Sequence, residues 1–471
     1  MLAVCIGGLP NPCLGGARWP QFRGTQAAGT AVGEKTPIHF GPSQSVLWKT
    51  ALAVGHSSPC IWEDRIFLTA FEGPQKLETI CLRCGDGKVL WRQVAPAQQI
   101  EMVGQSASAD ANPAASTPTT DGTNVCVYFG SFGLLCYDFE GKQKWQLPLA
   151  IPKTDFGTGT SPVLFRGRLL LNRDQNGDSF LMALDAGTGR QLWKTDRPLA
   201  IRGFSTPLVY HNGTVEEVIV SGNVQLAAYD LKDGALRWFA RGLPSFDVCP
   251  SPVAGEGLIF AGGVSNEGIP ASPQIPDFKA FLNQFDSNKD GKLQVQELPK
   301  VFKAYAMAFD ADKNGEITNE EWDKVVKYFA KGDNAIVAVR PDGQGDLTQA
   351  GIVWRQRRGV PRVATPLYYE GRLYVIKDGG LLSCFRAKDG KPLFELERLD
   401  AEGEYLASPV AADGRIYLCS RTGVIVVVEA GDKLRILERN SLGEPIYATP
   451  AIAGGNLYVR TTARLYAFGD K

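Results

Sequence analysis

Two twelve-residue stretches in the middle of the chain carry oxygen-bearing side chains at a regular spacing. The first runs from residue 286 to 297 and the second from residue 310 to 321. Calcium is a hard cation that takes roughly six to eight oxygen ligands. Positions 1, 3, 5, 9 and 12 offer side-chain oxygens and position 7 a backbone carbonyl, which predicts two calcium ions. The predicted ligands are Asp286, Asn288, Asp290, Lys292, Gln294 and Glu297 in the first stretch and Asp310, Asp312, Asn314, Glu316, Thr318 and Glu321 in the second.

This spacing is that of the EF-hand calcium loop. Gly291 and Gly315 take position 6, where the chain must turn sharply with a positive φ. Leu293 and Ile317 take the apolar position 8 and are expected to pair the two loops in a short β-contact. Two complete loops with the same key positions therefore predict a paired EF-hand.

Helices are expected before, between and after the two loops. The predicted ranges are residues 278–285, 298–309 and 322–329, so that one short helix connects the loops. A calcium sensor opens to expose a methionine-rich groove. This segment has a single methionine, Met307, which favours a mainly structural role for calcium.

The dipeptide Ser/Thr-Pro recurs along the chain and defines a repeat. Each dipeptide precedes a short apolar run, an alternating run, a second strand with a glycine turn such as Asp86-Gly87, and a last strand with a large aromatic residue such as Trp193. Four short strands per repeat, eight times over, predict an all-β eight-bladed β-propeller. The prolines are Pro59, Pro118, Pro162, Pro207, Pro252, Pro366, Pro409 and Pro450, separated by 41 to 59 residues except for one interval of 114.

The last repeat supplies only three strands, ending at residues 464–468. Residues 46–49 carry the same tryptophan pattern as the fourth strands of the other repeats. We expect them to complete the last blade, so that the ring closes by pairing the two ends of the chain. Closure removes exposed sheet edges, which would otherwise invite aggregation.

The long interval marks an insertion in the fifth blade. A small α-helical EF-hand pair is predicted at residues 269–332, and the propeller at residues 18–268 and 333–471. Residues 1–17 are apolar and small, which is typical of the apolar region and cleavage end of a secretory signal, although its usual basic start is missing. No other apolar run approaches the length of a membrane-spanning helix. The sequence thus predicts an extracytoplasmic protein, periplasmic or secreted, with no transmembrane segment.

The charge balance argues against nucleic acid as a partner. Fifty basic residues balance fifty acidic ones, whereas nucleic-acid binding needs a clustered basic surface. Eight cysteines lie beyond residue 17, most of them inside strand patterns, as Cys126 does. We interpret these cysteines as buried free thiols.

The repeat resembles the pyrroloquinoline-quinone (PQQ) type of propeller repeat. The resemblance rests on units such as residues 185–193, Asp-Ala-Gly-Thr-Gly-Arg-Gln-Leu-Trp, and covers residues 45–268 and 333–471. That family includes quinoprotein dehydrogenases and the propeller lipoprotein of the outer-membrane β-barrel assembly machine. In the dehydrogenases a disulfide between adjacent cysteines covers the quinone, and this sequence has no Cys-Cys dipeptide. Catalytic residues therefore stay unassigned, PQQ is not expected, and a PQQ-dependent dehydrogenase is the alternative function.

The loops that lead into the Ser/Thr-Pro strands are expected to gather at one mouth of the channel. Loops held by a rigid scaffold are where recognition concentrates, and aromatic and arginine side chains supply many binding hot spots. The predicted function is a calcium-binding scaffold with a protein or small-molecule ligand at this mouth. The same residues could instead cap blade ends and pair with one another. The candidate residues are His56, Asp155, Phe156, Arg202, Phe204, Phe246, Asp247, Arg362, Glu404, Tyr405 and Tyr447.

Overall fold

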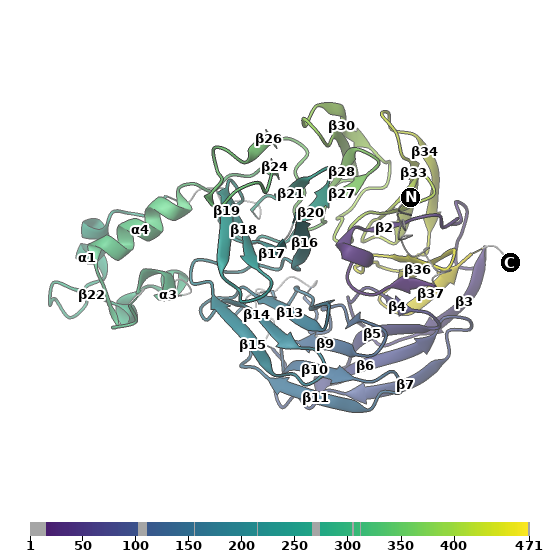
Figure 1. Ribbon diagram of the computed structural model, residues 1–471, viewed down its shortest axis with the longest axis horizontal. Coiled ribbons are helices and arrows are strands. Elements are labelled where there is room, and N and C mark those ends of the chain that lie inside the picture. Colours follow the sequence, from purple (N-terminus) through teal and green to yellow (C-terminus); the bar gives the residue numbers. More distant parts are fainter. Residues whose placement is uncertain are drawn as a thin grey trace, which may run out of the picture.

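The computed structural model contains eight sheets arranged as blades around a central channel (Figure 1). The predicted eight-bladed β-propeller is confirmed. The structure describes residues 16–101, 111–154, 156–213, 215–265, 274–303, 306–310 and 312–469. Nearly all of the predicted signal segment, the candidate residue Asp155 and the predicted boundary at residues 268–269 lie outside the described residues.

Each blade is an antiparallel sheet of four core strands, and blades 1 to 4 follow one another along the chain. Blade 1 has β4 (Cys60–Trp62), β5 (Arg65–Glu72), β6 (Lys76–Arg83) and β7 (Val89–Val94), with η2 (Gly73–Gln75) in a turn; blade 2 has β8 (Thr119–Thr120), β9 (Val125–Phe129), β10 (Gly133–Tyr137) and β11 (Gln143–Pro148). Blade 3 has β12 (Val163–Phe165), β13 (Arg168–Arg173), β14 (Phe180–Asp185) and β15 (Gln191–Asp196); blade 4 has β16 (Leu208–Asn212), β17 (Val215–Ser221), β18 (Gln225–Asp230) and β19 (Leu236–Arg241).

Blades 5 to 8 complete the ring. Blade 5 has β20 (Val253–Gly255), β21 (Leu258–Gly262), β24 (Ile336–Val339) and β26 (Ile352–Gln356); blade 6 has β27 (Leu367–Tyr369), β28 (Arg372–Lys377), β29 (Leu381–Arg386) and β30 (Pro392–Arg398). Blade 7 has β31 (Val410–Ala412), β32 (Arg415–Cys419), β33 (Val424–Glu429) and β34 (Ile436–Ser441); blade 8 has β35 (Ala451–Ala453), β36 (Asn456–Arg460), β37 (Arg464–Phe468) and β3 (Val46–Ala51). Because β3 pairs antiparallel with β37, the N-terminal part of the chain closes the ring.

Tryptophans of the outer strands pack between neighbouring blades. The glycine of the facing turn lets the indole approach, since a Cβ built at Gly234 would lie 2.5 Å from Trp193. Trp238 differs: its N–H donates to the Glu217 carboxylate, 3.0 Å away. There the next blade offers a long loop instead, whose β25 (Gly345–Asp346) pairs with β19. The other indole N–H groups donate to a carbonyl of the next blade over 2.7–3.0 Å, namely Trp48 to Cys84, Trp91 to Phe139, Trp145 to Ala186, Trp193 to Leu231 and Trp354 to Ala387.

A segment before the first blade crosses one mouth of the channel. β1 (Arg18–Trp19) pairs with β4 of blade 1, η1 (Thr25–Ala27) contacts β16 of blade 4, and β2 (Thr30–Ala31) pairs in parallel with β31 of blade 7. This segment was not predicted, because strands of two residues leave no periodic pattern in the sequence. The channel is therefore covered on this side.

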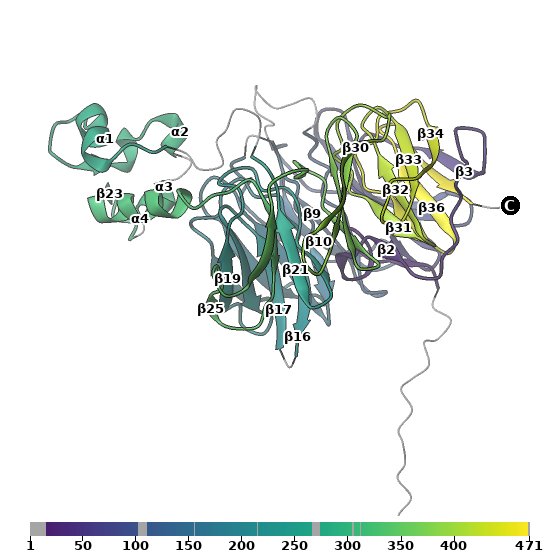
Figure 2. The same ribbon diagram turned by 90° about the horizontal axis from the view of Figure 1, so that it is seen from above.

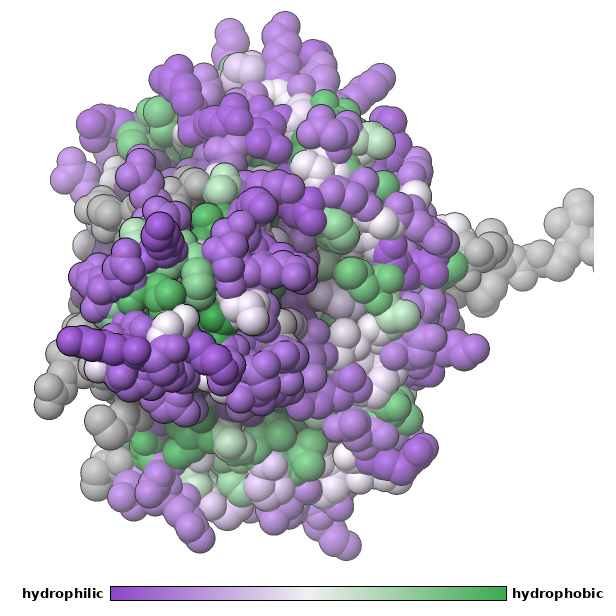
Figure 3. Space-filling view, turned by 90° about the vertical axis from the view of Figure 1, so that its left-hand side faces the viewer, coloured by the Kyte–Doolittle hydropathy of each residue, from purple (hydrophilic) through white to green (hydrophobic). Residues whose placement is uncertain are grey.

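The calcium module, residues 274–332, is inserted between β21 and β24 of blade 5 and projects from the ring (Figures 1 and 2). β22 and β23 place Leu293 opposite Ile317, so the predicted contact between the two loops is confirmed. Seen from its end, the surface is mostly hydrophilic with a few hydrophobic side chains between (Figure 3). The elements are α1 (Phe278–Phe285), β22 (Leu293–Gln294), η3 (Val295–Glu297), α2 (Lys300–Lys303), α3 (Ala306–Phe309), β23 (Glu316–Ile317) and α4 (Asn319–Phe329).

The helices of the module differ in detail from the prediction. α1 has the predicted bounds, whereas α4 begins three residues early because Thr318 caps it: its side chain accepts from the Glu321 N–H, and the Glu321 carboxylate accepts from the Thr318 N–H. Within the predicted connecting helix the structure describes α2 and α3, and residues 304 and 305 between them lie outside the described part.

Two further features concern the whole chain. The eight cysteines of the described ranges are free thiols, and six of them are buried. Among the described residues, no helix has the length and apolar character needed to cross a membrane.

Candidate functional site

The backbone of both predicted calcium loops has the same shape. Gly291 and Gly315 have φ angles of 82° and 86°, and Lys289 and Lys313, two residues earlier, have 60° and 61°. The N–H of each glycine donates to an aspartate at the start of its loop, Gly291 to Asp286 Oδ2 over 3.0 Å and Gly315 to the equivalent aspartate over 3.1 Å. The glycines hence take the positive φ that the sequence pattern requires.

The oxygens inside the loops fit a hard cation. Asp286 Oδ1 and Asp310 Oδ1 are buried and have no hydrogen-bond partner among the described residues. In the second loop, one carboxylate oxygen each from Asp310, Asp312 and Glu321 lies within 4.8 Å of the others. An unpartnered buried carboxylate oxygen is costly, and a cation between these oxygens would remove that cost.

Backbone hydrogen bonds favour the ionised form of two acids in the first loop. The N–H of Gln294 donates to Glu297 and lowers the pKa of that carboxyl, and the N–H of Lys292 does the same for Asp290. Both carboxylates therefore stay charged at neutral pH, the state that binds a metal. No comparable cluster of three acids is found in this loop as described, where Asn288 and Gln294 supply the other side-chain oxygens.

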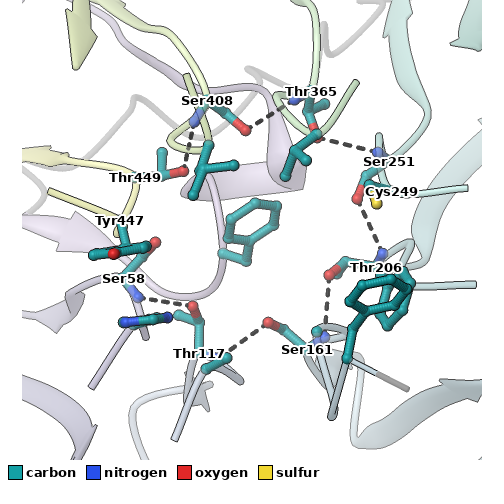
Figure 4. A pocket seen from close by; sticks show the side chains of 18 of the residues that line it. Ser58, Thr117, Ser161, Thr206, Cys249, Ser251, Thr365, Ser408, Tyr447 and Thr449 are labelled. Atoms are coloured by element: carbon teal, nitrogen blue, oxygen red, sulfur yellow. Dashed lines mark hydrogen bonds between the residues drawn. The ribbon is translucent and has the colours of Figure 1, made fainter. Parts of the chain in front are cut away.

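A ring of hydroxyl groups surrounds the channel (Figure 4). In each blade a Ser or Thr precedes the proline of the repeat. The backbone N–H of this residue donates to the hydroxyl oxygen of the equivalent residue in the next blade. Seven such bonds, 2.9–3.1 Å long, join the ring in the order Ser58, Thr117, Ser161, Thr206, Ser251, Thr365, Ser408 and Thr449. The recurring Ser or Thr before each proline is the sequence signal of this ring, although the repeat by itself indicates only the number of blades.

These hydroxyls line a cavity of about 330 Å³ on the channel axis. Phe22 is also part of the lining and belongs to the N-terminal segment that crosses one mouth of the channel. The neighbouring Arg23 is fully buried and donates to the carbonyls of Thr365, Pro366 and Pro409. Burial lowers the pKa of Arg23 to about 9, so the guanidinium is still charged at neutral pH and ties the segment to blades 6 and 7.

Two aromatic pairs lie in the cavity wall. His56 and Tyr447 are stacked, with ring centroids 4.0 Å apart and planes at 3°. Phe156 and Phe204 meet edge to face at 6.3 Å. All four residues line the cavity, which therefore offers aromatic surface to a ligand.

Ion pairs occupy the rest of the wall. Arg202 Nε lies 2.9 Å from Asp247 Oδ1, and Arg362 contacts Asp378 at 2.8 Å and Glu404 at 3.1 Å. Glu404 also pairs with Arg421. Three arginines in and behind the wall thus face three carboxylates, and the charges of these six groups cancel.

Two titratable groups near the cavity have shifted pKa values. Burial raises the pKa of Glu101 to about 7, and its Oε2 accepts from the hydroxyl of the lining residue Thr158 over 2.8 Å. Burial also raises the pKa of the lining thiol Cys249 to about 12. Cys249 is accordingly protonated at neutral pH and is no nucleophile there.

Most of the candidate binding residues come together in the structure. Arg202 lies behind the lining, with its guanidinium 5.3 Å above the Phe156 ring. Phe246 is turned away and stacks on Phe329 of the calcium module at 6.1 Å. Tyr405 is buried, and its hydroxyl donates to the Ala401 carbonyl. The candidates in the cavity wall are His56, Phe156, Phe204, Asp247, Arg362, Glu404 and Tyr447.

The comparison with protein families agrees with this architecture. The model of the family described as outer membrane protein assembly factor BamB matches residues 80–269 and 304–470. The chain belongs to this family. A second model, described as EF hand, matches residues 278–302 of this BamB-family chain, which cover the first loop and the helix before it. No curated protein sequence was found to match.

Solved structures share the fold at low sequence identity. BamB from Moraxella catarrhalis is 12% identical with a TM-score of 0.56, and the match covers 90% of this chain and 98% of that one. A europium-containing methanol dehydrogenase is 10% identical with a TM-score of 0.60, covering 96% and 98%. The quinohemoprotein alcohol dehydrogenase from Comamonas testosteroni is 11% identical with a TM-score of 0.55, covering 96% and 81%. At these identities the likeness establishes the fold alone.

Proposed function

We propose that this protein is a calcium-binding propeller scaffold that binds a small molecule or an exposed side chain of a partner protein in its channel cavity. Two calcium ions occupy the EF-hand loops and serve mainly to hold the module in shape. The observation that carries the proposal is a cavity closed at one mouth and lined with aromatic rings and hydroxyls, in a chain whose projecting module has two loops with cation-binding geometry.

The calcium part rests on the donor set. Each loop presents a buried aspartate oxygen, Asp286 Oδ1 or Asp310 Oδ1, that has no partner in the part of the chain that the structure describes, beside further oxygens. Glu297 and Glu321 would each supply the last ligand, and Lys292 and Glu316 a backbone carbonyl. An extracellular-type module is expected to bind calcium with a Kd on the order of 10⁻⁴–10⁻³ M. A bound ion would neutralise the crowded carboxylates and fix the ends of α1 and α4.

The binding part rests on the size and chemistry of the cavity. Ligand pockets usually have volumes of roughly 300–1,000 Å³ and combine apolar walls with a few polar groups. The cavity of about 330 Å³ is at the lower end of that range. Its aromatic pairs would stack on a ring or aliphatic group, and the hydroxyl ring would supply hydrogen-bond partners.

We propose an extracytoplasmic location. Cleavage of the predicted signal after Ala17 would leave Arg18, the first residue of β1, at the new N-terminus. The description of the matching family as an outer membrane assembly factor supports the same location. N-terminal sequencing of the protein from its native cells tests this, and a retained residue 1 would contradict export by cleavage.

The cavity is tested by filling it. Val363 lines the cavity, whereas Val353 is an exposed residue of β26 with 38% of its surface accessible. Val363→Trp should abolish saturation-transfer NMR signals from indole, a neutral aromatic probe, and Val353→Trp should leave them unchanged. Equal signals from both variants, each with the melting temperature of the unmodified protein, would contradict the binding site, as would no signal from the unmodified protein.

The alternative is a PQQ-dependent quinoprotein dehydrogenase, which the shared fold and a cavity on the channel axis favour. The cavity wall does not fit that cofactor well, because PQQ carries several carboxylates and the three nearby arginines already face three acids. We therefore derive no catalytic step. Dye reduction with alcohols or sugars after addition of PQQ and calcium, well above a blank, would favour the dehydrogenase and overturn the scaffold proposal.

A further inference from the structure

The calcium module is inserted in blade 5 but rests on blade 4. The Tyr328 hydroxyl of α4 donates to the Asn223 carbonyl over 2.6 Å, and the Ser245 hydroxyl donates to the Phe329 carbonyl over 3.0 Å. Phe329 also stacks on Phe246, with ring planes at 10°. The end of α4 is thus bonded to two loops of blade 4, around residues 223 and 245. We call these two loops, together with the loop around residue 201, the seat of the module.

The apolar core of the module continues into this seat. Ile201 and Val224 of the propeller belong to one buried cluster with Phe329 and Trp322 of α4. The same cluster includes Leu293, Phe309 and Ile317, which lie in or next to the calcium loops. Packed cores do not deform continuously, so a structural change in the two calcium loops would be transmitted to the seat.

Asn223 ties the seat together. It is fully buried; its Oδ1 accepts from the Ile201 N–H and its Nδ2 donates to the Ser245 carbonyl, both over 2.7 Å. Its own carbonyl receives the Tyr328 hydroxyl. One residue therefore joins three elements: its side chain bonds to the loops at residues 201 and 245, and its backbone carbonyl bonds to the end of α4.

The backbone of the seat is strained. Arg202, Val224 and Asp247 have φ angles of 49°, 68° and 54°. Such angles are uncommon for residues other than glycine, and for a β-branched valine they are outliers. Strained residues of this kind persist only where the surroundings hold them, and they cluster at functional sites.

Two of these three strained loops have one residue on the module and the next at the cavity. Ile201 and Phe246 pack in the module's cluster, while the following residues, Arg202 and Asp247, form the ion pair of the cavity wall. Asp247 lines the cavity, and Arg202 lies over Phe156. A shift of the seat would move both halves of the ion pair and the aromatic ring beside them.

We propose that calcium binding in the module regulates the cavity: the ordered end of α4 holds Ile201 and Phe246, and these hold the Arg202–Asp247 wall in its binding shape. This regulation rests on the proposed function of the cavity and of the loops. Binding energies at two linked sites change reciprocally, typically by fivefold or more. A ligand in the cavity should accordingly strengthen calcium binding by the same factor by which calcium strengthens ligand binding.

Hydrogen–deuterium exchange of the full chain with and without calcium tests the coupling without any cavity ligand. Calcium should slow exchange in residues 199–206 and 243–250 by about fivefold. Tyr328→Phe removes only the hydroxyl that reaches Asn223 and should reduce this slowing to less than about twofold. The matched control is Tyr374→Phe, which removes a hydroxyl that donates to the Gly431 carbonyl of the ring and should leave the slowing intact.

The outcomes separate the coupling from the proposed function. If calcium slows exchange in the module, residues 274–332, but not in residues 199–206 and 243–250, calcium binds and the coupling is wrong. Equal behaviour of the two tyrosine variants would also overturn it. If the module itself does not respond, both the calcium sites and the coupling are wrong. If the loops respond but indole does not bind, the coupling stands and the cavity ligand proposal fails.

Discussion

The propeller ring and the calcium module obtain their stability in different ways. In the ring, tryptophans of the outer strands pack between neighbouring blades and seven hydrogen bonds join the Ser/Thr positions of successive blades, so similar contacts recur around a ring that closes on itself. The module has one apolar cluster and loops in which Asp286 and Asp310 keep unpartnered buried oxygens. Among the described residues, these two oxygens have no contact that would balance their charge without a metal.

The ring is therefore the region that positions the cavity, and the module is the region that can respond to calcium. Most of the cavity wall belongs to the segments that lead into the first strand of each blade, and the hydroxyl ring joins these segments to one another. The exception is the Arg202–Asp247 side, which is backed by the module. A rigid scaffold with one adjustable wall is a suitable arrangement for a regulated binding site.

Substitution of two buried tryptophans is expected to show the largest difference between the ring and the module. Trp193→Ala removes an indole between blades 3 and 4 and should lower the free energy of unfolding of the ring, measured in urea, by about 3–5 kcal/mol. Trp322→Ala removes the centre of the module's cluster and should abolish calcium binding while the ring keeps its stability. Loss of calcium binding in the first variant, or of ring stability in the second, would show that the two regions do not fold separately.

The pH dependence of stability should also differ between the regions. Glu101 has a pKa raised from 4.5 to about 7 by burial, so the folded ring binds its proton more tightly than the unfolded chain. This contribution is fully present below pH 4.5 and is lost as the pH rises to 7, at a cost of about 3 kcal/mol. Glu101→Gln should abolish the fall in the free energy of unfolding between pH 4.5 and 7, measured by unfolding in urea at both pH values. An unchanged pH profile would place the titration elsewhere.

A single hydroxyl of the ring should matter less. Thr117→Val keeps the side-chain shape but leaves the buried Ser58 N–H without its acceptor, which should cost about 1–3 kcal/mol. The control is Thr123→Val in the same blade, at an exposed position, where no change is expected. Equal stability of the two variants would mean that the hydroxyl ring contributes little to the ring's rigidity.

Removal of the module should have the smallest effect on the ring. The two stems of the insertion lie together, since Ser265 N–H donates to Asn334 Oδ1 over 3.0 Å. Joining Ser265 to Asp333 through a short Gly/Ser linker should leave one cooperative melt, lowered by a few degrees because Ile201 and Phe246 lose their cover. A non-cooperative melt would show that the module is needed to hold blades 4 and 5.

The sequence predicted those features that repeat or that follow a fixed spacing. The blades, the insertion and the calcium loops belong to this group, because Ser/Thr-Pro and the loop positions recur with the same neighbours. The segment from Arg18 to Ala31 was missed, since Arg23 bonds to carbonyls more than three hundred residues away along the chain. A contact of that range leaves no local pattern.

The direction in which loop side chains point was the other feature that the sequence did not predict. Phe246 and Asp247 are neighbours and were predicted together, yet one packs on the module and the other lines the cavity. Tyr405 carries the expected aromatic character but is buried within its blade, beside Glu404 in the wall. Neighbouring residues of a loop point to opposite sides, and only the packed structure shows which one faces the channel.

The most direct test of the account is calorimetric titration of the full chain with calcium. The account predicts two ions for the unmodified protein, and one each for Glu297→Ala and Glu321→Ala. Glu316→Gln should keep two, because this position contributes only its backbone carbonyl. A stoichiometry of two in either alanine variant, or fewer than two in the unmodified protein or in Glu316→Gln, would contradict the assignment of the calcium ligands.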